Sequence, residues 1–274
     1  MADNFGIVCF GRGIEKRWRS DLAGMYWWPT AYLEKTNPVG QHSGLFTPEL
    51  KLDSDDESVL IAGGHVNAMA TATMFVEGAV SGKLPRLLSW AAGRPKYLEG
   101  ESPDLSEGSV FFTTFKDQLS FWGWNNILDG VKIEFQTQNK NTRDDLLQSL
   151  DMAKQMGLSK LIIISVLVHL RRIHEFYKFA LRVQPDFADI KVEFKASELA
   201  FLNVQNVGGN LLLDDKEAVG FFNNVTLANI IESPVYRRTA AREQKGIEDL
   251  RAGRYNFGDR SVVTSGIDPV KYDF

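Results

Sequence analysis

The chain has 274 residues and lacks three features that define large protein classes. It contains a single cysteine, Cys9, so no internal disulfide can form. It has neither an apolar signal segment at the N-terminus nor an apolar run long enough to span a bilayer. Positive charge is not in excess, since the formal net charge is -4 at pH 7. We therefore expect a cytoplasmic protein without membrane insertion and without general nucleic-acid binding, because a phosphate-backbone binder should be basic.

Complete motifs for phosphate binding or nucleophilic catalysis are missing as well. Gly11-Arg12-Gly13 follows an apolar run, but the third glycine and the immediate helix of a dinucleotide fingerprint are lacking, so a plain turn is favoured. Neither a phosphate loop G-x-x-x-x-G-K-[ST] nor a nucleophile elbow G-x-S-x-G occurs. No metal site is predicted, because His169 and His174 lie on different helix faces and no tighter His/Asp/Glu group is present.

The chain does contain a regular alternation of apolar runs and helical patterns. Its 44% hydrophobic and 24% charged residues are ordinary for a globular protein. Short apolar runs separated by helical patterns of about 10 to 15 residues predict βαβ units on a parallel sheet. The expected fold class is α/β, a three-layer Rossmann-like fold with helices on both faces. The expected strands are Ser58–Ala62, Arg86–Trp90, Val131–Phe135, Leu161–Ile164 and Lys191–Phe194.

This pattern predicts three parts of the chain. Residues 1–55 form an N-terminal extension packed on the core, 56–232 the α/β domain, and 233–274 a helical or irregular C-terminal tail. Within the extension, Gly6–Phe10 reads as an added strand and Met25–Pro29 as irregular structure. The tail from Tyr236 to Leu250 is either a solvated, self-paired helix or a lid that offers Arg or Tyr to an anionic ligand.

The segment Val131–Leu181 is the most informative part of the domain. It reads as strand, polar loop, helix, strand and helix. Thr142 is the expected N-cap of the first helix, with Asp145 reaching back to it, and Gly157 the expected left-handed C-cap residue. If the two strands are parallel, the loops after them open at one edge of the sheet, where open α/β folds bind ligands.

Four stretches match one family pattern in order. They are SVLIAGGHVNAM, RLLSWAAGRPKY with DLSEGSVFF, IEFQTQNKNTRDDLLQS and KLIIISVLVHLRR. Together they resemble the YdcF/SanA/ElyC-like family of bacterial α/β proteins, over roughly residues 56–200. The resemblance implies a Rossmann-like fold with a small ligand at the sheet edge. Members of that family are linked to S-adenosylmethionine binding, with no reaction attached to the family.

The resemblance also implies a set of site residues. Ser89 takes the place of the serine in the family's Ser-Gly-Gly, although Trp90 and Ala91 replace its glycines. The expected catalytic residues are His169, Glu107 and Arg172. The expected residues that bind the cofactor are Gly63, Gly64, Asn67, Ser89, Gly93, Glu134, Asn139, Asn141, Thr142 and Asp144.

Several of these residues have a structural interpretation beside the functional one. Glu107 is either the carboxylate of a capping box with Asp104 as N-cap, or an acceptor for ribose hydroxyls or a general acid/base. Asn139 and Asn141 either make Asx turns or hydrogen-bond a base or sugar. His169 is either an ordinary surface or packed residue, or it acts as a general base or donates a hydrogen bond to a phosphate or carboxylate. Arg172 can bind a ligand carboxylate or phosphate with two hydrogen bonds.

Three functions follow as hypotheses. The first is binding of S-adenosylmethionine or a related adenosyl or nucleotide ligand, as a transferase. The second is hydrolysis or transfer at a phosphate ester of a nucleotide or sugar, with His169 as acid/base and Arg172 stabilising charge. The third is a non-catalytic interaction protein or homo-oligomer, suggested by the tryptophans near Trp27 and Trp122.

Overall fold

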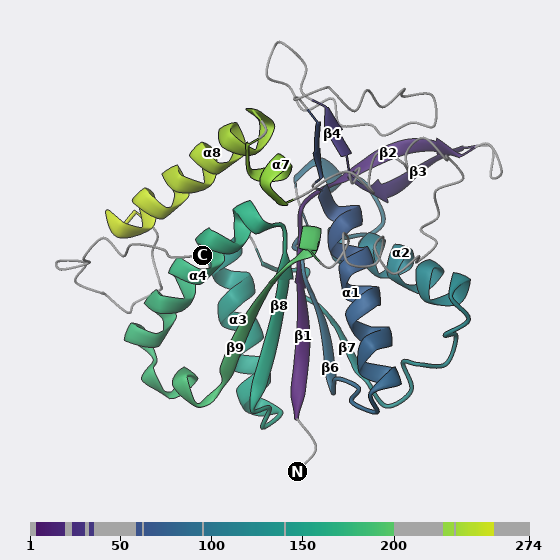
Figure 1. Ribbon diagram of the computed structural model, residues 1–274, viewed down its shortest axis with the longest axis horizontal. Helices are drawn as coiled ribbons and strands as arrows, with labels where there is room; N and C mark the ends of the chain where they lie inside the picture. Colours follow the sequence, from purple (N-terminus) through teal and green to yellow (C-terminus); the bar gives the residue numbers. More distant parts are fainter. Residues whose placement is uncertain are drawn as a thin grey trace.

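A five-stranded parallel sheet forms the centre of the protein, covered by helices on both faces (Figure 1). The computed structural model describes residues 4–19, 24–30, 33–35, 59–61, 63–94, 96–139, 141–199, 227–232 and 234–254. The strand order is β7-β6-β1-β8-β9. This confirms the predicted Rossmann-like α/β fold. The strands are β1 (Phe5–Phe10), β6 (Leu87–Ala91), β7 (Lys132–Phe135), β8 (Lys160–Ser165) and β9 (Lys191–Ala196).

Two apolar clusters hold the helices on the sheet. In β1, Ile7 and Cys9 face one cluster with α1 and α2, whereas Val8 and Phe10 face the other with α3 and α4. Strands that are buried on both faces read as continuous apolar runs, as the FGIVCF of β1 does. The helices are α1 (Gly63–Val80), α2 (Glu107–Phe121), α3 (Thr142–Gln155) and α4 (Leu167–Val183).

The first strand of the sheet differs from the prediction. Val59–Ile61 forms β5, which pairs antiparallel with β4 (Leu33–Lys35) outside the main sheet, so the prediction that Ser58–Ala62 opens the sheet is wrong. The central strand is β1, which pairs in parallel with both β6 and β8. The strand Phe5–Phe10, which the prediction placed in the N-terminal extension, therefore belongs to the core of the main sheet. The runs Phe5–Phe10 and Val59–Ile61 are both short and lie close before glycines. Hydrophobic periodicity could not show which of them pairs with the main sheet.

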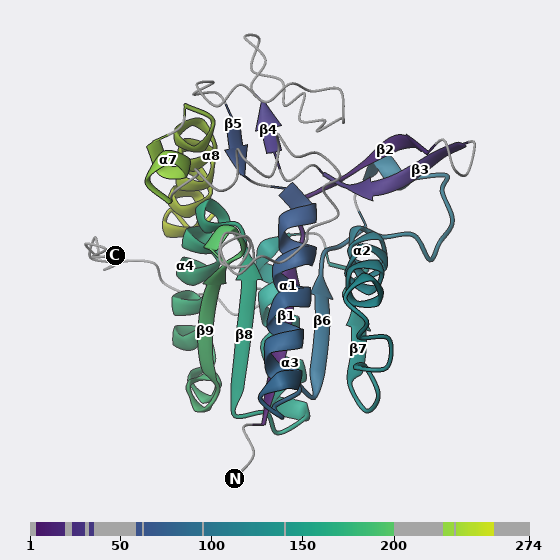
Figure 2. The ribbon, with the colours of Figure 1, turned by 45° about the vertical axis from the view of Figure 1, so that its right-hand side comes forward.

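A hairpin stands beside the sheet (Figure 2). It consists of β2 (Ile14–Arg19) and β3 (Gly24–Pro29), which pair antiparallel. The prediction of irregular structure at Met25–Pro29 is therefore wrong, because pairing with β2 makes this aromatic segment a strand. Short 3-10 helices cover Lys96–Leu98 and Pro185–Asp189. Trp27 and Trp122 are partly buried against the core cluster under α1 and α2.

The tail forms a helix that lies along α4 in both ribbon views (Figures 1 and 2). This is α8 (Pro234–Arg251), preceded by the short α7 (Leu227–Glu232), so the predicted helix at Tyr236–Leu250 is confirmed. Gly157, after α3, has a φ of 62°, as predicted for a C-cap residue. The sequence also predicts a helix at Asp215–Ile231, and most of that range lies outside the described residues. None of the described helices has the length and apolar character needed to cross a bilayer.

The strand order creates a crevice at the carboxyl ends of the strands. From β1 the chain moves outward through β6 to β7, then crosses to the other side of β1 for β8 and β9. The loops after β1 and β8 therefore lead to opposite sides of the sheet. Ligands of open α/β folds bind at such a switch point.

Substitution in β1 tests its central position. Val8 is fully buried between β6 and β8, whereas Val80 at the end of α1 is 73% exposed. We expect Val8→Ala to lower the free energy of unfolding by about 2 kcal/mol, because it leaves a cavity in the core. Val80→Ala is the matched control and should change it by less than about 0.5 kcal/mol. Equal effects in chemical denaturation would contradict a core role for β1.

Candidate functional site

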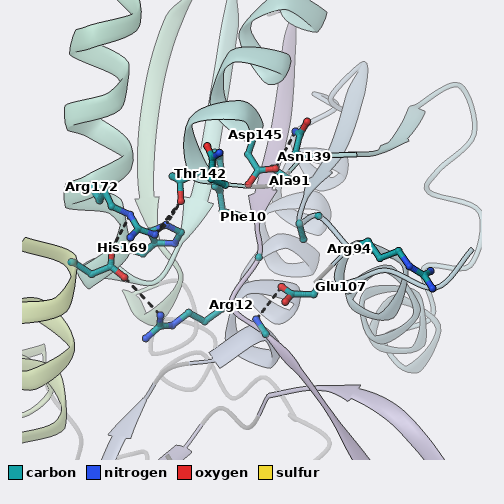
Figure 3. A pocket seen from close by; sticks show the side chains of 16 residues that line it. Phe10, Arg12, Ala91, Arg94, Glu107, Asn139, Thr142, Asp145, His169 and Arg172 are labelled. Carbon is teal, nitrogen blue, oxygen red and sulfur yellow. Dashed lines mark hydrogen bonds and ion pairs between the residues drawn. The ribbon is translucent and has the colours of Figure 1, made fainter. Parts of the chain in front are cut away.

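A pocket of about 550 Å³ lies at the carboxyl ends of the strands (Figure 3). The loops after β1, β6 and β7, the first turns of α2 and α3, the first two turns of α4, and one residue of α8 form its walls. The lining residues are Phe10, Gly11, Arg12, Gly13, Ala91, Ala92, Gly93, Arg94, Glu107, Asn139, Asn141, Thr142, Asp145, His169, Arg172 and Glu243.

Glu107 faces this pocket because other residues cap α2. The hydroxyl of Ser106 accepts a hydrogen bond from the Ser109 amide at 3.1 Å, and the Ser109 hydroxyl accepts one from the Ser106 amide at 2.9 Å. The predicted capping box of Asp104 and Glu107 is therefore wrong. The Glu107 carboxylate instead accepts hydrogen bonds from the Gly13 amide at 3.1 Å and from the Tyr97 hydroxyl at 3.0 Å. Burial raises the pKa of Glu107.

The start of α3 differs from the prediction in the same way. Its N-cap is Asn141, whose side chain accepts from the Asp144 amide at 3.1 Å and donates to the Asp144 carboxylate at 3.0 Å. The predicted N-cap, Thr142, instead lies inside the first turn, and its hydroxyl faces His169. Asp145 does not reach back to the cap but accepts a hydrogen bond from Asn139 at 3.1 Å. Burial raises the pKa of Asp145 to about 7.

His169 is buried and held at both ring nitrogens. Its Nε2 lies 3.2 Å from an amino group of Arg172 and 3.2 Å from the Thr142 hydroxyl, and its Nδ1 lies 3.2 Å from the Ser165 hydroxyl. Arg172 can only donate, so Nε2 accepts and Nδ1 carries the proton. Burial lowers the pKa of His169 well below its usual value, and the positive charges of Arg172 and Arg12 add to this effect. The imidazole is therefore neutral at pH 7.

Two arginines make one wall of the pocket positive. Arg172 donates to the Thr142 hydroxyl at 3.0 Å, and its Nε lies 3.1 Å from the carboxylate of Glu243 on α8. Arg12 follows β1, and its guanidinium lies 3.9 Å from the same carboxylate. Figure 3 shows both guanidinium groups on one side of the pocket, away from Glu107 and Asp145. The pocket thus has a cationic end and an acidic end.

Protein groups already occupy the helix N-termini around the pocket. Thr30 accepts from the first amides of α1 at 2.7 and 3.1 Å, and both oxygens of Glu198 accept from the Leu167 amide of α4 at 2.9 and 2.8 Å. Ser106 and Asn141 cap α2 and α3. A phosphate usually binds to the amides of a helix N-terminus. Such a group would have to displace a capping side chain here, so the arginines are the available anion-binding groups of the pocket.

Seven of the predicted site residues do line the pocket. The loop residue Gly93 is one of them, and a Cβ at this position would lie 2.1 Å from the Asn139 carbonyl oxygen. Gly93 therefore allows the loops after β6 and β7 to meet. The complete set is Gly93, Glu107, Asn139, Asn141, Thr142, His169 and Arg172.

The other six predicted residues do not line the pocket. They are Gly63, Gly64, Asn67, Ser89, Glu134 and Asp144. Gly63 and Gly64 open α1, and the glycine turn at the pocket is Gly11–Gly13 because β1 is the first strand of the sheet. Asn67 donates to the Phe10 carbonyl at 2.8 Å.

The remaining three of those six residues make local contacts. Ser89 is buried under the pocket and accepts from Gln136 at 2.9 Å. Glu134 pairs with Lys132 at 3.5 Å, and Asp144 pairs with Arg143. These three residues support the loops and the sheet around the pocket and do not line the pocket itself.

Nine lining residues were not predicted as site residues, and these are Phe10, Gly11, Arg12, Gly13, Ala91, Ala92, Arg94, Asp145 and Glu243. The sequence predicts a plain turn at Gly11-Arg12-Gly13 after an added strand, and the position of β1 in the centre of the sheet brings this turn to the pocket. The tail helix reaches the sheet edge, as one alternative proposed, through Glu243 rather than through Arg or Tyr. Arg94 also lines the pocket, but its guanidinium donates to five backbone carbonyls between Leu98 and Leu105 and so organises that loop.

No protein-family model, curated protein or solved structure matches this chain. The resemblance to the YdcF-like family therefore stays a prediction. Within the described residues, no group of three or more His, Cys, Asp or Glu side chains could hold a metal ion.

The raised pKa of Asp145 makes its effect on stability depend on pH. The folded state keeps this proton up to about pH 7, whereas the unfolded chain releases it near 3.8. The stability from this proton is fully present below the unfolded pKa and is lost as pH rises through 7. The asparagine of Asp145→Asn cannot ionise. We therefore expect the free energy of unfolding of this variant, relative to that of the original protein, to be about 2 kcal/mol higher at pH 8 than at pH 5.

Denaturation of both proteins at the two pH values measures this difference. Asp151→Asn is the control, since Asp151 is exposed on the same helix and should show no such change. If the difference in free energy of unfolding between Asp145→Asn and the original protein were equal at both pH values, it would contradict a buried, protonated Asp145.

Proposed function

We propose that this pocket binds S-adenosylmethionine or a related adenosyl compound, and that the protein uses it as the group donor of a transferase. Arg12 and Arg172 would bind the ligand carboxylate with charge-assisted hydrogen bonds. Glu107 and Asp145 would accept hydrogen bonds from the ribose hydroxyls. The neutral His169 would lie at the carboxylate end.

The separation of two guanidinium groups from two carboxyl groups within the pocket is the observation that carries this proposal. The cationic end is formed by Arg12 and Arg172, and the acidic end by Glu107 and Asp145 (Figure 3). S-adenosylmethionine has a carboxylate at one end and groups that donate hydrogen bonds along the rest of its length. A volume of about 550 Å³ lies within the usual range for pockets that bind a small molecule.

The capped helix N-termini favour this ligand over nucleotide polyphosphates. A pyrophosphate gains most of its binding from helix amides and a glycine turn. Here the first amides of α1 bond to Thr30, and the Gly13 amide bonds to the Glu107 carboxylate. A phosphate at that turn would also meet the negative charge of Glu107. The resemblance to the YdcF-like family supports the same ligand on separate grounds.

Isothermal titration tests the proposal. We expect S-adenosylmethionine and its demethylated product to bind, and ATP and nucleotide sugars to bind at least about tenfold more weakly. Arg172→Gln should weaken binding at least about tenfold by removing a contact to the carboxylate, and Glu107→Gln should do the same by weakening the contact to the ribose. Arg182→Gln, at the far end of α4, is the control. If no adenosyl compound produces heat, the proposal is wrong.

A second candidate function is hydrolysis or transfer at a phosphate ester. The observation in its favour is the neutral imidazole of His169 beside Arg172, since an unprotonated nitrogen can act as a base next to a group that stabilises negative charge. In a screen of phosphate-containing metabolites, His169→Ala should then abolish turnover. His174→Ala is the matched control, because His174 packs on Phe194 of β9. Turnover that survives His169→Ala would exclude this role.

A further inference from the structure

The tail helix α8 supplies a carboxylate to the cationic end of the pocket. Glu243 is only 7% exposed. Its Oε2 lies 3.1 Å from the Nε of Arg172, and its Oε1 lies 3.9 Å from the Nη1 of Arg12. The two arginines come from opposite sides of the switch point, one after β1 and one from α4. A single carboxylate therefore serves two guanidinium groups from distant parts of the chain.

Packing of α8 on α4 holds this carboxylate in place. A Cβ at Gly246 would lie 2.9 Å from the Cδ of Arg172, so the helix backbone rests directly on that side chain. Leu250 is buried in the same cluster as the apolar face of α4. Arg251 forms an ion pair with the buried Glu175 of α4 at 3.2 Å. Glu243 thus stands on a docked helix beside the two arginines.

The charges at this end of the pocket sum to a single positive charge. Arg12 and Arg172 contribute two positive charges, and Glu243 removes one. His169 is neutral. Glu198 does not line the pocket; it is bonded to the Leu167 amide at the N-terminus of α4, and burial raises its pKa to about 7.

We propose that Glu243 determines the charge class of the ligand, so that this end of the pocket accepts a group with one negative charge and rejects a dianion. A carboxylate or a phosphodiester belongs to the accepted class, and a phosphate monoester belongs to the rejected class. This inference rests on the proposed function of the pocket and specifies its anionic end. Glu243 acts through the two arginines and is a specificity-determining residue, not a catalytic one.

The physical basis is the balance of charge in a partly buried site. Two guanidinium groups without a counter-ion would attract a dianion more strongly than a monoanion. The carboxylate halves that attraction, whereas the cost of desolvating an ion rises with the square of its charge and still opposes the dianion in full. Specificity often depends on such an opposing cost as well as on attraction.

Two small ions of similar shape and different charge test this inference. Dimethyl phosphate carries one negative charge, and methyl phosphate carries nearly two at pH 8, because its second pKa is near 6. NMR titration at pH 8 gives the ratio of their affinities for each variant. We expect Glu243→Gln to shift this ratio toward methyl phosphate by about tenfold or more, because a full unit of positive charge is uncovered.

Charge restoration separates this role from a merely structural one. Arg12→Gln alone should shift the ratio in the opposite direction, toward the monoanion. The double substitution of Arg12→Gln with Glu243→Gln brings the net charge back to one positive unit and should bring the ratio back to its original value. Because the double variant removes both partners of one ion pair, it provides a test even if Glu243→Gln alone does not fold. Glu248→Gln, exposed on the same helix, is the control and should leave the ratio unchanged.

An unchanged ratio in Glu243→Gln, or in Arg12→Gln if only that variant folds, overturns the inference. Failure of the double variant to restore the ratio also overturns it. The two ions contain no adenosyl group, so this experiment is separate from the test of the proposed function. If the ratio shifts while S-adenosylmethionine fails to bind, the adenosyl ligand is wrong and the charge selection stands.

Discussion

The parallel pairing of β1 with both β6 and β8 is the constraint on which the candidate site depends. It places the turn after β1 between the loops that follow its two neighbours. Arg12 thereby comes within reach of Arg172 and Glu243, and the Gly13 amide comes within reach of Glu107. The strand is buried on both faces, so its position is fixed by packing against α1 and α2 on one face and against α3 and α4 on the other. Without β1 in the centre, the residues of the pocket would not share an edge.

The way in which the helices are capped then decides what the pocket can bind. Small side chains satisfy the first amides of α1, α2 and α3, and Glu198 satisfies that of α4. Glu107 and Thr142 are thereby left to face the pocket instead of capping their helices. The same capping removes the amides that a polyphosphate would use. Side-chain charge, with two arginines at one end and two carboxyls at the other, becomes the main source of recognition.

The fold class and about half of the site residues could be predicted from the sequence. Alternating patterns and short loops were sufficient for the parallel sheet, and Glu107, His169 and Arg172 could be placed at its edge because parallel strands end together. The position of β1 could not be predicted, because Phe5–Phe10 and Val59–Ile61 are both short apolar segments and the pairing that separates them is long-range. The predicted N-caps of α2 and α3 were wrong by two residues and one residue. As a result Asp144 was predicted to bind the ligand and Asp145 to cap α3, whereas Asp144 lies at the cap and Asp145 lines the pocket. Glu243 had no local signal, since both of its partners lie far away in the sequence.

The most direct test of the central claim is a crystal structure of the protein in complex with S-adenosylmethionine. Our account predicts that the ligand lies in the pocket with its carboxylate in hydrogen-bonding distance of Arg12 and Arg172. Its ribose hydroxyls should lie at the Glu107 end. A ligand bound outside the pocket, or bound inside it with the carboxylate at the acidic end, would contradict the account.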